Sequence, residues 1–414
     1  MTFARLIAVF GRIGFLSFGG PAAQIALMHR ILVDEENWLE EKDFLSALSF
    51  CMLLPGPEAM QLATYSGWKL RGVPGGLIAG LLFVLPGAVV MAALASIYAL
   101  WGGVPLVAAL FVGVKAVIVV IVIEALLKVS KKALTGRQGW AIAGLSFLGI
   151  FAFHLPFPLI VAVAALWGWV TAPPARAVPP GPPVTGTLRT IAVWGTLWAT
   201  PVLALWASGQ TLLTEIAMFF SKLAVVTFGG AYAVLAYMTQ EVVQQKGWLT
   251  TEAMIDGLGL AETTPGPLIL VTEFVGFLTG YGAGGFPLAF AAALVTLWMT
   301  FVPCFLWIFA GAPYIARLTT MPRLSAALRA ITAAVVGVIL NLSLWFAAHV
   351  FFRDVGQWEA GPLHLILPDP ATIQPLPALI AIGAAVLMFG FRQGLERTLI
   401  FGALAALVAH LPMR

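Results

Sequence analysis

Glycine and proline interrupt long apolar segments at matched places, and these interruptions are where the sequence could bind a ligand. The string GGP at 19–21 lies in the middle of the apolar segment 3–32, and PGP at 55–57 lies in the middle of segment 44–70. Such a break leaves backbone N–H and C=O groups without helical partners, which costs several kcal/mol per group in hydrocarbon. It is tolerated where the backbone lines a cavity or meets a ligand.

The second half of the chain has the same two breaks, GG at 229–230 and PGP at 265–267. Where a helix resumes after a break, its N-terminus presents free N–H groups and a positive dipole end, which favour an anion. The alternative is that the breaks are kinks that let helices pack closely. Four breaks in two matched pairs favour a binding site.

Charged residues lie near the breaks. Arg12 and Lys222 each precede a Phe-Gly-Gly by six residues, and two such cations could neutralise a dianion. The alternative is that both snorkel to the membrane surface. The residues that we assign to substrate binding are Arg12, Phe18, Gly19, Gly20, Pro55, Gly56, Pro57, Lys222, Phe228, Gly229, Gly230, Pro265, Gly266 and Pro267.

Three carboxylates, Glu58, Glu262 and Glu273, lie in apolar surroundings. An ionisable group inside a membrane is a functional candidate by default, so these side chains could carry a coupling proton or pair with Arg12 or Lys222. Two further cations, Lys69 and Arg71, lie at a segment end, where they could form an entry funnel or only fix the topology.

Composition places these residues in a membrane. The chain of 414 residues is 61% hydrophobic and only 10% charged, whereas a soluble domain carries roughly 25% charged residues. This excludes a cytosolic enzyme, a secreted disulfide scaffold, a disordered chain and a nucleic-acid binder. The net charge of +4 fits Lys and Arg on cytoplasmic loops. We expect no catalytic residue, metal site or cofactor.

The apolar segments predict an all-α polytopic membrane protein. Residues 73–114 and 274–316 contain no charged residue or histidine, and each run is about twice the ~20 residues of a spanning helix. Each run therefore predicts two helices joined by a Gly/Pro turn. Residues 171–190 contain six prolines and predict a non-helical linker, followed by an extra connecting span at 191–207.

The two halves repeat each other at an offset of 210 residues. Residues 10–57 and 220–267 align without a gap, with 14 identities in 48 positions. The predicted organisation is an N-terminal repeat at 1–170, the linker at 171–190, the extra span at 191–207 and a C-terminal repeat at 208–414. An internal repeat in a polytopic protein points to a transporter.

Loop charges predict that the repeats are inverted. The first half has a basic loop at 128–137, whose counterpart at 345–355 holds only Arg353, and the second half has basic residues at 317–329, whose counterpart at 100–106 is uncharged. Cytoplasmic loops gather Lys and Arg, so corresponding loops lie on opposite sides. The N-terminus and the linker are then cytoplasmic, and the broken helices meet near the midplane.

The strings FGGP, LLPGP and GWKLRGVPGG resemble the N-terminal half of chromate ion transporters, and AETTPGP with its flanking segments is similar to that family's C-terminal half. The resemblance covers both halves, as in the long two-half form of the family. It implies efflux of chromate, a tetrahedral dianion, across the cytoplasmic membrane, and hence chromate resistance. Sulfate is the isosteric competitor. We also consider a homodimer in the lipid bilayer.

Two other functions are compatible with the sequence. A transporter of sulfate or another oxyanion would use the same breaks, and a passive anion channel would need a continuous wet pore. A pseudo-twofold repeat with midplane breaks fits alternating access better than a channel.

Cysteine labelling tests the inverted topology. Single cysteines that replace Lys131 and Asp354 should react with a membrane-impermeant maleimide from opposite sides of the membrane, because the basic loop at 128–137 and its counterpart at 345–355 are predicted to face opposite compartments. Labelling of both from the same side would show that the repeats are parallel.

Overall fold

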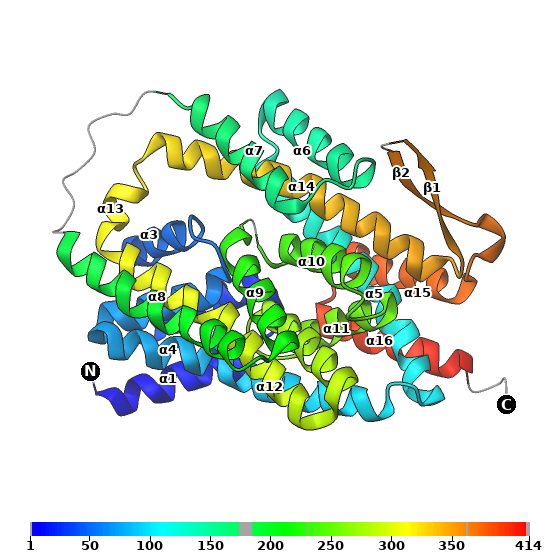
Figure 1. Ribbon diagram of the computed structural model, residues 1–414, viewed down its shortest axis with the longest axis horizontal. Coiled ribbons are helices and arrows are strands. Elements are labelled where there is room, and N and C mark those ends of the chain that lie inside the picture. Colours follow the sequence, from blue (N-terminus) through cyan, green and yellow to red (C-terminus); the bar gives the residue numbers. More distant parts are fainter. Residues whose placement is uncertain (1, 174–183, 229, 362, 411–414) are drawn as a thin grey trace. The chain divides into compact units, whose positions relative to one another are not determined.

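The computed structural model describes residues 2–173, 184–228, 230–361 and 363–410, and helices form most of it (Figure 1). The chain forms two compact units. Unit 1 contains Met1–Ser96, Thr171–Val234 and Leu260–Ala326, and unit 2 contains Ile97–Val170, Leu235–Gly259 and Ala327–Arg414. Each unit takes segments from both halves of the sequence, so the repeated halves do not coincide with the compact units.

Unit 1 is built from broken and hairpin helices. Its helices are α1 (Phe3–Leu16), α2 (Gly20–His29), η1 (Arg30–Glu35), α3 (Glu41–Cys51), α8 (Val184–Ala207), α9 (Thr211–Val226), η3 (Leu268–Leu270), α12 (Val271–Gly311), η4 (Ala312–Tyr314) and α13 (Ile315–Leu318). Four helices in the described part of the chain run from one unit into the other: α4 (Glu58–Trp101), α10 (Ala231–Thr239), α11 (Thr251–Thr263) and α14 (Pro322–Phe351).

The helices α4 and α12 are each two arms of a hairpin. Arg71 and Gly72 have non-helical backbone angles in α4, and Gly284 and Gly285 do so in α12. A Cβ built on Gly67 would lie 2.3 Å from the carbonyl oxygen of Gly75. In a straight helix, two residues eight positions apart would be separated by about 12 Å. The chain therefore doubles back, with short arms at 58–70 and 271–283 and long arms at 73–101 and 286–311.

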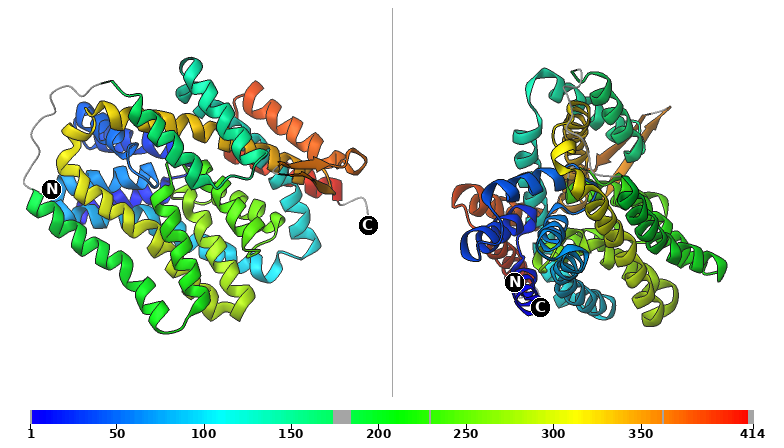
Figure 2. Two further views of the ribbon diagram at one scale, coloured as in Figure 1. Left: turned by 45° about the horizontal axis from the view of Figure 1, so that its top comes forward. Right: turned by 90° about the vertical axis from the view of Figure 1, so that its left-hand side faces the viewer.

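Small residues let the long arms approach other segments of unit 1. A Cβ on Gly80 would lie 2.7 Å from the Phe305 ring, so the long arm of α4 packs directly on that of α12. Helix α8 lies along α12 (Figure 2), where Trp194 stacks on Phe305 with ring centroids 5.6 Å apart. The Trp298 indole also donates to the Leu197 carbonyl at 3.0 Å.

Unit 2 is a helical assembly with one β-hairpin. Its remaining elements are α5 (Pro105–Ala133), α6 (Gly136–Phe151), α7 (Phe157–Val170), η2 (Gln240–Gln245), β1 (Val355–Ala360), β2 (Leu363–Pro368), η5 (Pro370–Thr372), α15 (Pro375–Ala385), η6 (Val386–Gly390) and α16 (Leu395–His410). Helix α5 packs on α16, where a Cβ on Gly113 would meet the Gly402 carbonyl.

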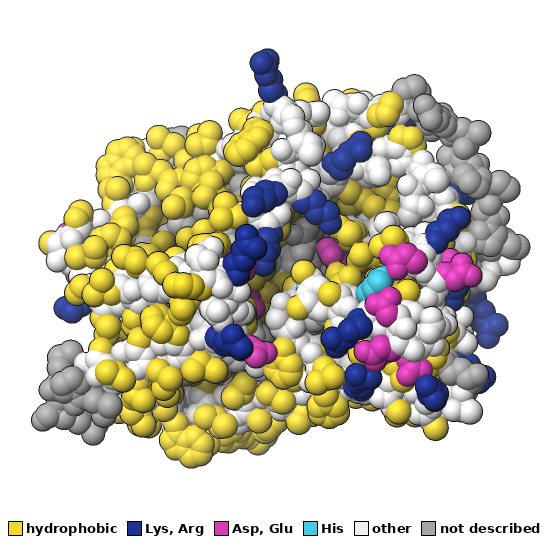
Figure 3. Space-filling view, turned by 180° about the vertical axis from the view of Figure 1, so that it is seen from behind, with side chains coloured by type: hydrophobic (Ala, Val, Ile, Leu, Met, Phe, Trp, Pro, Cys, Tyr) yellow, Lys and Arg dark blue, Asp and Glu magenta, His cyan; other side chains and the backbone are white. Residues whose placement is uncertain are grey.

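Membrane-spanning helices are confirmed. Five helices in the described part of the chain are long and apolar enough to cross a bilayer, and hydrophobic side chains cover much of the face seen in Figure 3. The predicted turns are also present, since α4 ends at Trp101 before α5 begins at Pro105, and α12 ends at Gly311.

One local prediction was wrong. The end of the predicted non-helical linker is helical, because α8 begins at Val184 and the proline cluster ends at Pro183; residues 174–183 lie outside the described residues. Between α14 and η5, an antiparallel hairpin pairs β1 with β2. Its exposed positions include Gln357 and Glu359 as well as Trp358 and Leu367.

Replacing Gly87 tests the close packing of the long α4 arm. A Cβ at this position would lie 2.1 Å from the Pro265 carbonyl oxygen, so Gly87→Ala must displace the backbone of the 265–267 break. We expect a loss of about 1–3 kcal/mol, as in other overpacked cores, seen as a lower thermal unfolding temperature in detergent. The control is Gly103→Ala, which has no atom within 4 Å of the added Cβ; equal unfolding temperatures for the two variants would contradict this packing.

Candidate functional site

The four breaks lie in unit 1, where they bond to one another in two crossed pairs. The Gly56 N–H donates to the Thr227 carbonyl at 2.9 Å, and the Gly266 N–H donates to the Ser17 carbonyl at 2.8 Å. Gly266 lies 210 residues after Gly56, and Thr227 lies 210 residues after Ser17, so the two bonds join equivalent positions of the two repeats. The break after α1 therefore meets the break before α12, and the break after α9 meets the break before α4.

The long hairpin arms hold both crossings from a second side. At one crossing, a Cβ on Gly56 would lie 2.9 Å from the Cys304 sulfur of α12. At the other, Gly266 lies against the α4 arm, where its Cβ would be 3.6 Å from the Gly87 Cα. Gly56 and Gly266 have positive φ of 114° and 86°, so both the backbone conformation and the available space require glycine.

Two buried glutamines hydrogen-bond to the carbonyl groups that the breaks leave free. The Gln24 amide donates to the Gly266 carbonyl at 2.6 Å and to the Ser17 carbonyl at 3.3 Å. The Gln61 amide donates to the Pro55 carbonyl at 2.6 Å. The side-chain oxygens of both glutamines are buried without a hydrogen-bond partner among the described residues, so each crossing has capacity for one more donor. Neither glutamine stands out in the sequence, because its role comes from tertiary contacts.

The helix N-termini at the breaks differ in charge. Glu58 lies in the first turn of α4 and Glu273 in the first turn of α12, so an acidic side chain already lies at each of these positive dipole ends. The first turns of α2 and α10 contain no acidic residue. The N-termini of α2 and α10 are therefore the ones with a field available for an anion.

Glycines at these two N-termini have open space beside them. Gly20 and Gly230 have positive φ of 77° and 98°, and a Cβ on either would meet no atom within 4 Å. Phe18 and Phe228 are half-buried beside them, and their N–H groups bond to the carbonyls of Leu16 and Val226. Gly19 is the left-handed N-cap of α2, and Gly229 lies outside the described residues.

The three predicted carboxylates have different surroundings. Glu262 is buried and accepts a 2.7 Å hydrogen bond from the Tyr232 hydroxyl. Glu273 is 2% exposed, and one of its oxygens is buried without a hydrogen-bond partner among the described residues. Glu58 is half-buried at the start of α4. Burying a carboxyl group without a partner is costly unless the group holds a proton, so Glu273 fits a proton carrier best.

The predicted cations lie on the surface of unit 1. The Arg12 guanidinium forms a 3.0 Å ion pair with Glu35, and Lys222 is exposed. Lys69 pairs with Asp43 at 2.6 Å, and Arg71 lies over the Phe3 ring at the hairpin turn of α4. The prediction that Arg12 and Lys222 flank a dianion stays a prediction, and Arg12 would first have to leave Glu35.

Unit 2 contains a buried charge pair that the sequence analysis missed. The Lys115 ammonium of α5 lies 3.6 Å from Asp256 of α11, and the Tyr98 hydroxyl donates to the other Asp256 oxygen at 2.9 Å. A signal for it was available, because Lys115 directly follows the charge-free run 73–114.

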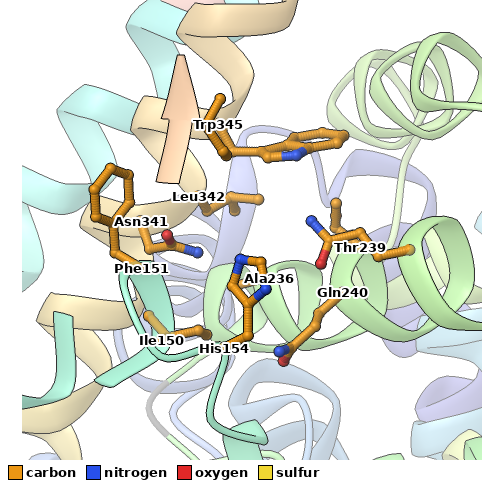
Figure 4. A pocket seen from close by; sticks show the side chains of 11 residues that line it. Ile150, Phe151, His154, Ala236, Thr239, Gln240, Asn341, Leu342 and Trp345 are labelled. Atoms are coloured by element: carbon orange, nitrogen blue, oxygen red, sulfur yellow. The ribbon is translucent and has the colours of Figure 1, made fainter. Parts of the chain in front are cut away.

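Unit 2 also has a small polar cavity, in which His154, Asn341 and Gln240 lie around a common space (Figure 4). Its volume is about 20 Å³, which is room for a single water molecule. Thr239 and Gln240 line it with buried oxygens that have no hydrogen-bond partner among the described residues. The neighbouring His364 ring stacks on His154, and burial together with His364 lowers the pKa of His154. A tetrahedral oxyanion does not fit here.

Comparison with known proteins identifies the family. The family described as "Chromate transporter" matches residues 4–169 and 214–410, so each half of the chain matches it. The chain is 28% identical to a chromate transport protein of Cupriavidus metallidurans, with 99% of this chain and 94% of that protein covered. It is 31% identical to a probable chromate transport protein of Synechococcus elongatus, with 89% and 92% covered.

A chromate transport protein of Pseudomonas aeruginosa is 34% identical, with 82% of this chain and 80% of that protein covered. No solved structure matches the chain. With matches in both halves, and with relatives that align over most of its length, this chain belongs to the chromate transporter family.

Proposed function

We propose that this protein is a secondary transporter that exports chromate across the cytoplasmic membrane and thereby confers chromate resistance. Family membership and the names of the relatives support chromate as the substrate. The proposed orientation has the N-terminus and the linker in the cytoplasm, with the two repeats inverted, as the loop charges predict.

The observation that carries this proposal is the reciprocal crossing of the breaks at Gly56 and Gly266. At each crossing one backbone hydrogen bond joins the two repeats. The first turns of α2 and α10 present N–H groups toward the breaks, apart from Pro21, which has none, and Ala233, whose N–H bonds to the Gly230 carbonyl at 3.3 Å. We place the oxyanion at these N-termini, beside the open space at Gly20 and Gly230.

The membrane potential supports export rather than uptake. An inside-negative potential favours expulsion of an anion by ~2.3 kcal/mol per charge per 100 mV, and therefore of a dianion by ~4.6 kcal/mol. The potential thus drives export, whereas uptake would need cotransported cations. We propose that Glu58, Glu262 and Glu273 carry a coupling proton or pair with Arg12 or Lys222, and a proton on Glu273 is the form that its burial favours.

Sulfate is the alternative substrate, because it has the same shape and charge as chromate and the N-terminal N–H groups recognise both features. A passive anion channel is the alternative mechanism. The crossings favour a transporter over a channel. A channel of this design would need a continuous wet pore, whereas the N–H groups of Gly56 and Gly266 bond the two repeats to each other at this place. In the transporter, Arg12 and Lys222 add positive charge around the site. Arg12 does so when it leaves its ion pair with Glu35 and pairs with the anion instead.

Flux measurements in proteoliposomes test this function. Purified protein in vesicles with an imposed potential should move radiolabelled chromate toward the positive side, with saturation at high chromate and competition by sulfate. The rate should fall when the potential is collapsed, because the field acts on the transported charge.

Empty vesicles serve as the control for leakage. Vesicles that contain the Gly87→Ala variant show the effect of displacing the backbone at the 265–267 break. A flux that rises linearly with chromate without saturation would identify a channel. Transport of sulfate without chromate transport would assign the alternative substrate.

Replacement of Gly20 tests the position of the site. Asparagine tolerates positive φ better than other side chains, and its Cβ meets no atom here, so Gly20→Asn should insert and fold. Its side chain would occupy the space proposed for the anion, and we expect at least a tenfold loss in kcat/KM, equivalent to about 1.4 kcal/mol. The measurement is chromate flux, normalised to the amount of folded protein.

The matched control is Gly209→Asn in the α8–α9 connection, where φ is 71° and no atom lies within 4 Å of the added Cβ. Its flux should equal that of the unmodified protein. Full activity in Gly20→Asn would mean that the anion does not approach the α2 N-terminus.

A further inference from the structure

A large cavity in unit 2 lies beside the buried Lys115–Asp256 pair. Its volume is about 500 Å³, within the usual range for small-molecule sites and far above the 20 Å³ of the cavity around His154. It lies between α5, the start of α11, the end of α14 and the start of α15. Its charged and titratable lining residues are Lys115, Glu252, His349 and Arg353.

The ion pair beside this cavity is loosely made. The Lys115 nitrogen and the nearer Asp256 oxygen are 3.6 Å apart, which is longer than a hydrogen bond. That oxygen is buried and has no hydrogen-bond partner among the described residues, while the Tyr98 hydroxyl holds the other oxygen. The Lys115 side chain is 20% exposed and that of Asp256 is 6% exposed, so the cation lies nearer the open cavity than the anion does.

The other groups around the cavity leave room for an added anion. Arg353 is exposed at the end of α14, and His349 is fixed by a 2.8 Å contact between its Nδ1 and the Trp345 carbonyl. Because a carbonyl only accepts, this His349 nitrogen carries the hydrogen. Glu252 is exposed to solvent. The carboxylate of the lining is thus the solvent-exposed Glu252, and the buried Asp256 lies outside the lining, beside Lys115.

We propose that this cavity is a second binding site for a tetrahedral oxyanion, in which the anion replaces Asp256 as the partner of the Lys115 ammonium. The identity of the anion rests on the proposed function. Arg353 and the cavity-lining hydroxyl of Thr251 supply further donors to its oxygens. The Tyr98 hydroxyl continues to hold Asp256 after it is displaced.

A competitive pair and a structural pair respond differently to mutation. If Asp256 competes with the anion for Lys115, its removal must tighten anion binding, whereas loss of Lys115 must weaken it. A pair that only holds α5 to α11 would give the same direction for both changes, since either variant would leave one buried charge without a partner.

The test is equilibrium dialysis of the purified full-length protein with radiolabelled chromate and with radiolabelled sulfate. Asp256→Asn should lower the Kd of this site by about five- to tenfold, as expected for removal of a competing charge. The double variant Lys115→Gln/Asp256→Asn should raise the Kd by at least about the same factor. This double variant leaves no buried charge unpaired, so it stays folded even where Lys115→Gln alone does not.

Helix α5 supplies the matched control. Glu124 and Lys128 form an ion pair at 2.8 Å outside the cavity, and the variant Glu124→Gln/Lys128→Gln should bind both anions with unchanged Kd. Thermal unfolding in detergent checks that all variants are folded. All variants are measured in the Gly20→Asn background, which weakens binding at the α2 N-terminus equally in each, so the differences in Kd between variants report on the site in unit 2.

The outcomes separate this inference from the proposed function. Opposite shifts in the two Asp256 variants support the second site. Unchanged Kd in both variants, or weaker binding in both, overturns it while chromate transport through the breaks still stands. Absence of chromate and sulfate binding to the unmodified protein overturns the substrate class, and the second site with it.

Discussion

Unit 1 depends on one constraint, which is that backbone polar groups exposed at apolar depth must find partners. Each break frees N–H and C=O groups that hydrocarbon cannot solvate. The protein meets this constraint by crossing the breaks, so that the Gly56 N–H finds the Thr227 carbonyl and the Gly266 N–H finds the Ser17 carbonyl. These bonds join the two repeats, in agreement with a unit 1 that takes segments from both halves.

The same constraint determines which residues are tolerated around the crossings. Two backbone segments can hydrogen-bond directly only where no side chain separates them. Glycine meets this condition at Gly56 and Gly266, which have positive φ and close neighbours. Other breaks keep open space, as at Gly20, where the helix N-terminus has no acidic residue in its first turn. Tight contacts thus hold the crossings, and the N-termini with open space are where we propose that an anion binds.

The sequence predicted the features that depend on local chemistry. The break positions, the offset of 210 residues and the turns near 101–105 and 311 follow from glycine, proline and charge placement. The partner of each break was not predictable, because the bond from Gly56 to Thr227 joins residues far apart in the chain. The doubling back of α4 at Gly72 agrees with the end of the apolar segment 44–70 at Lys69 and Arg71, directly before the charge-free run 73–114. Gln24, Gln61 and Asp256 were missed because their importance comes from tertiary contacts.

The most direct measurement is an anomalous difference map at the chromium absorption edge, from a crystal of the full-length protein with bound chromate. The account predicts a chromium peak within hydrogen-bonding reach of the first-turn N–H groups of α2 or α10, beside Gly20 or Gly230. A map with chromium at other positions and none at either N-terminus would contradict the claim that the crossed breaks form the transport site.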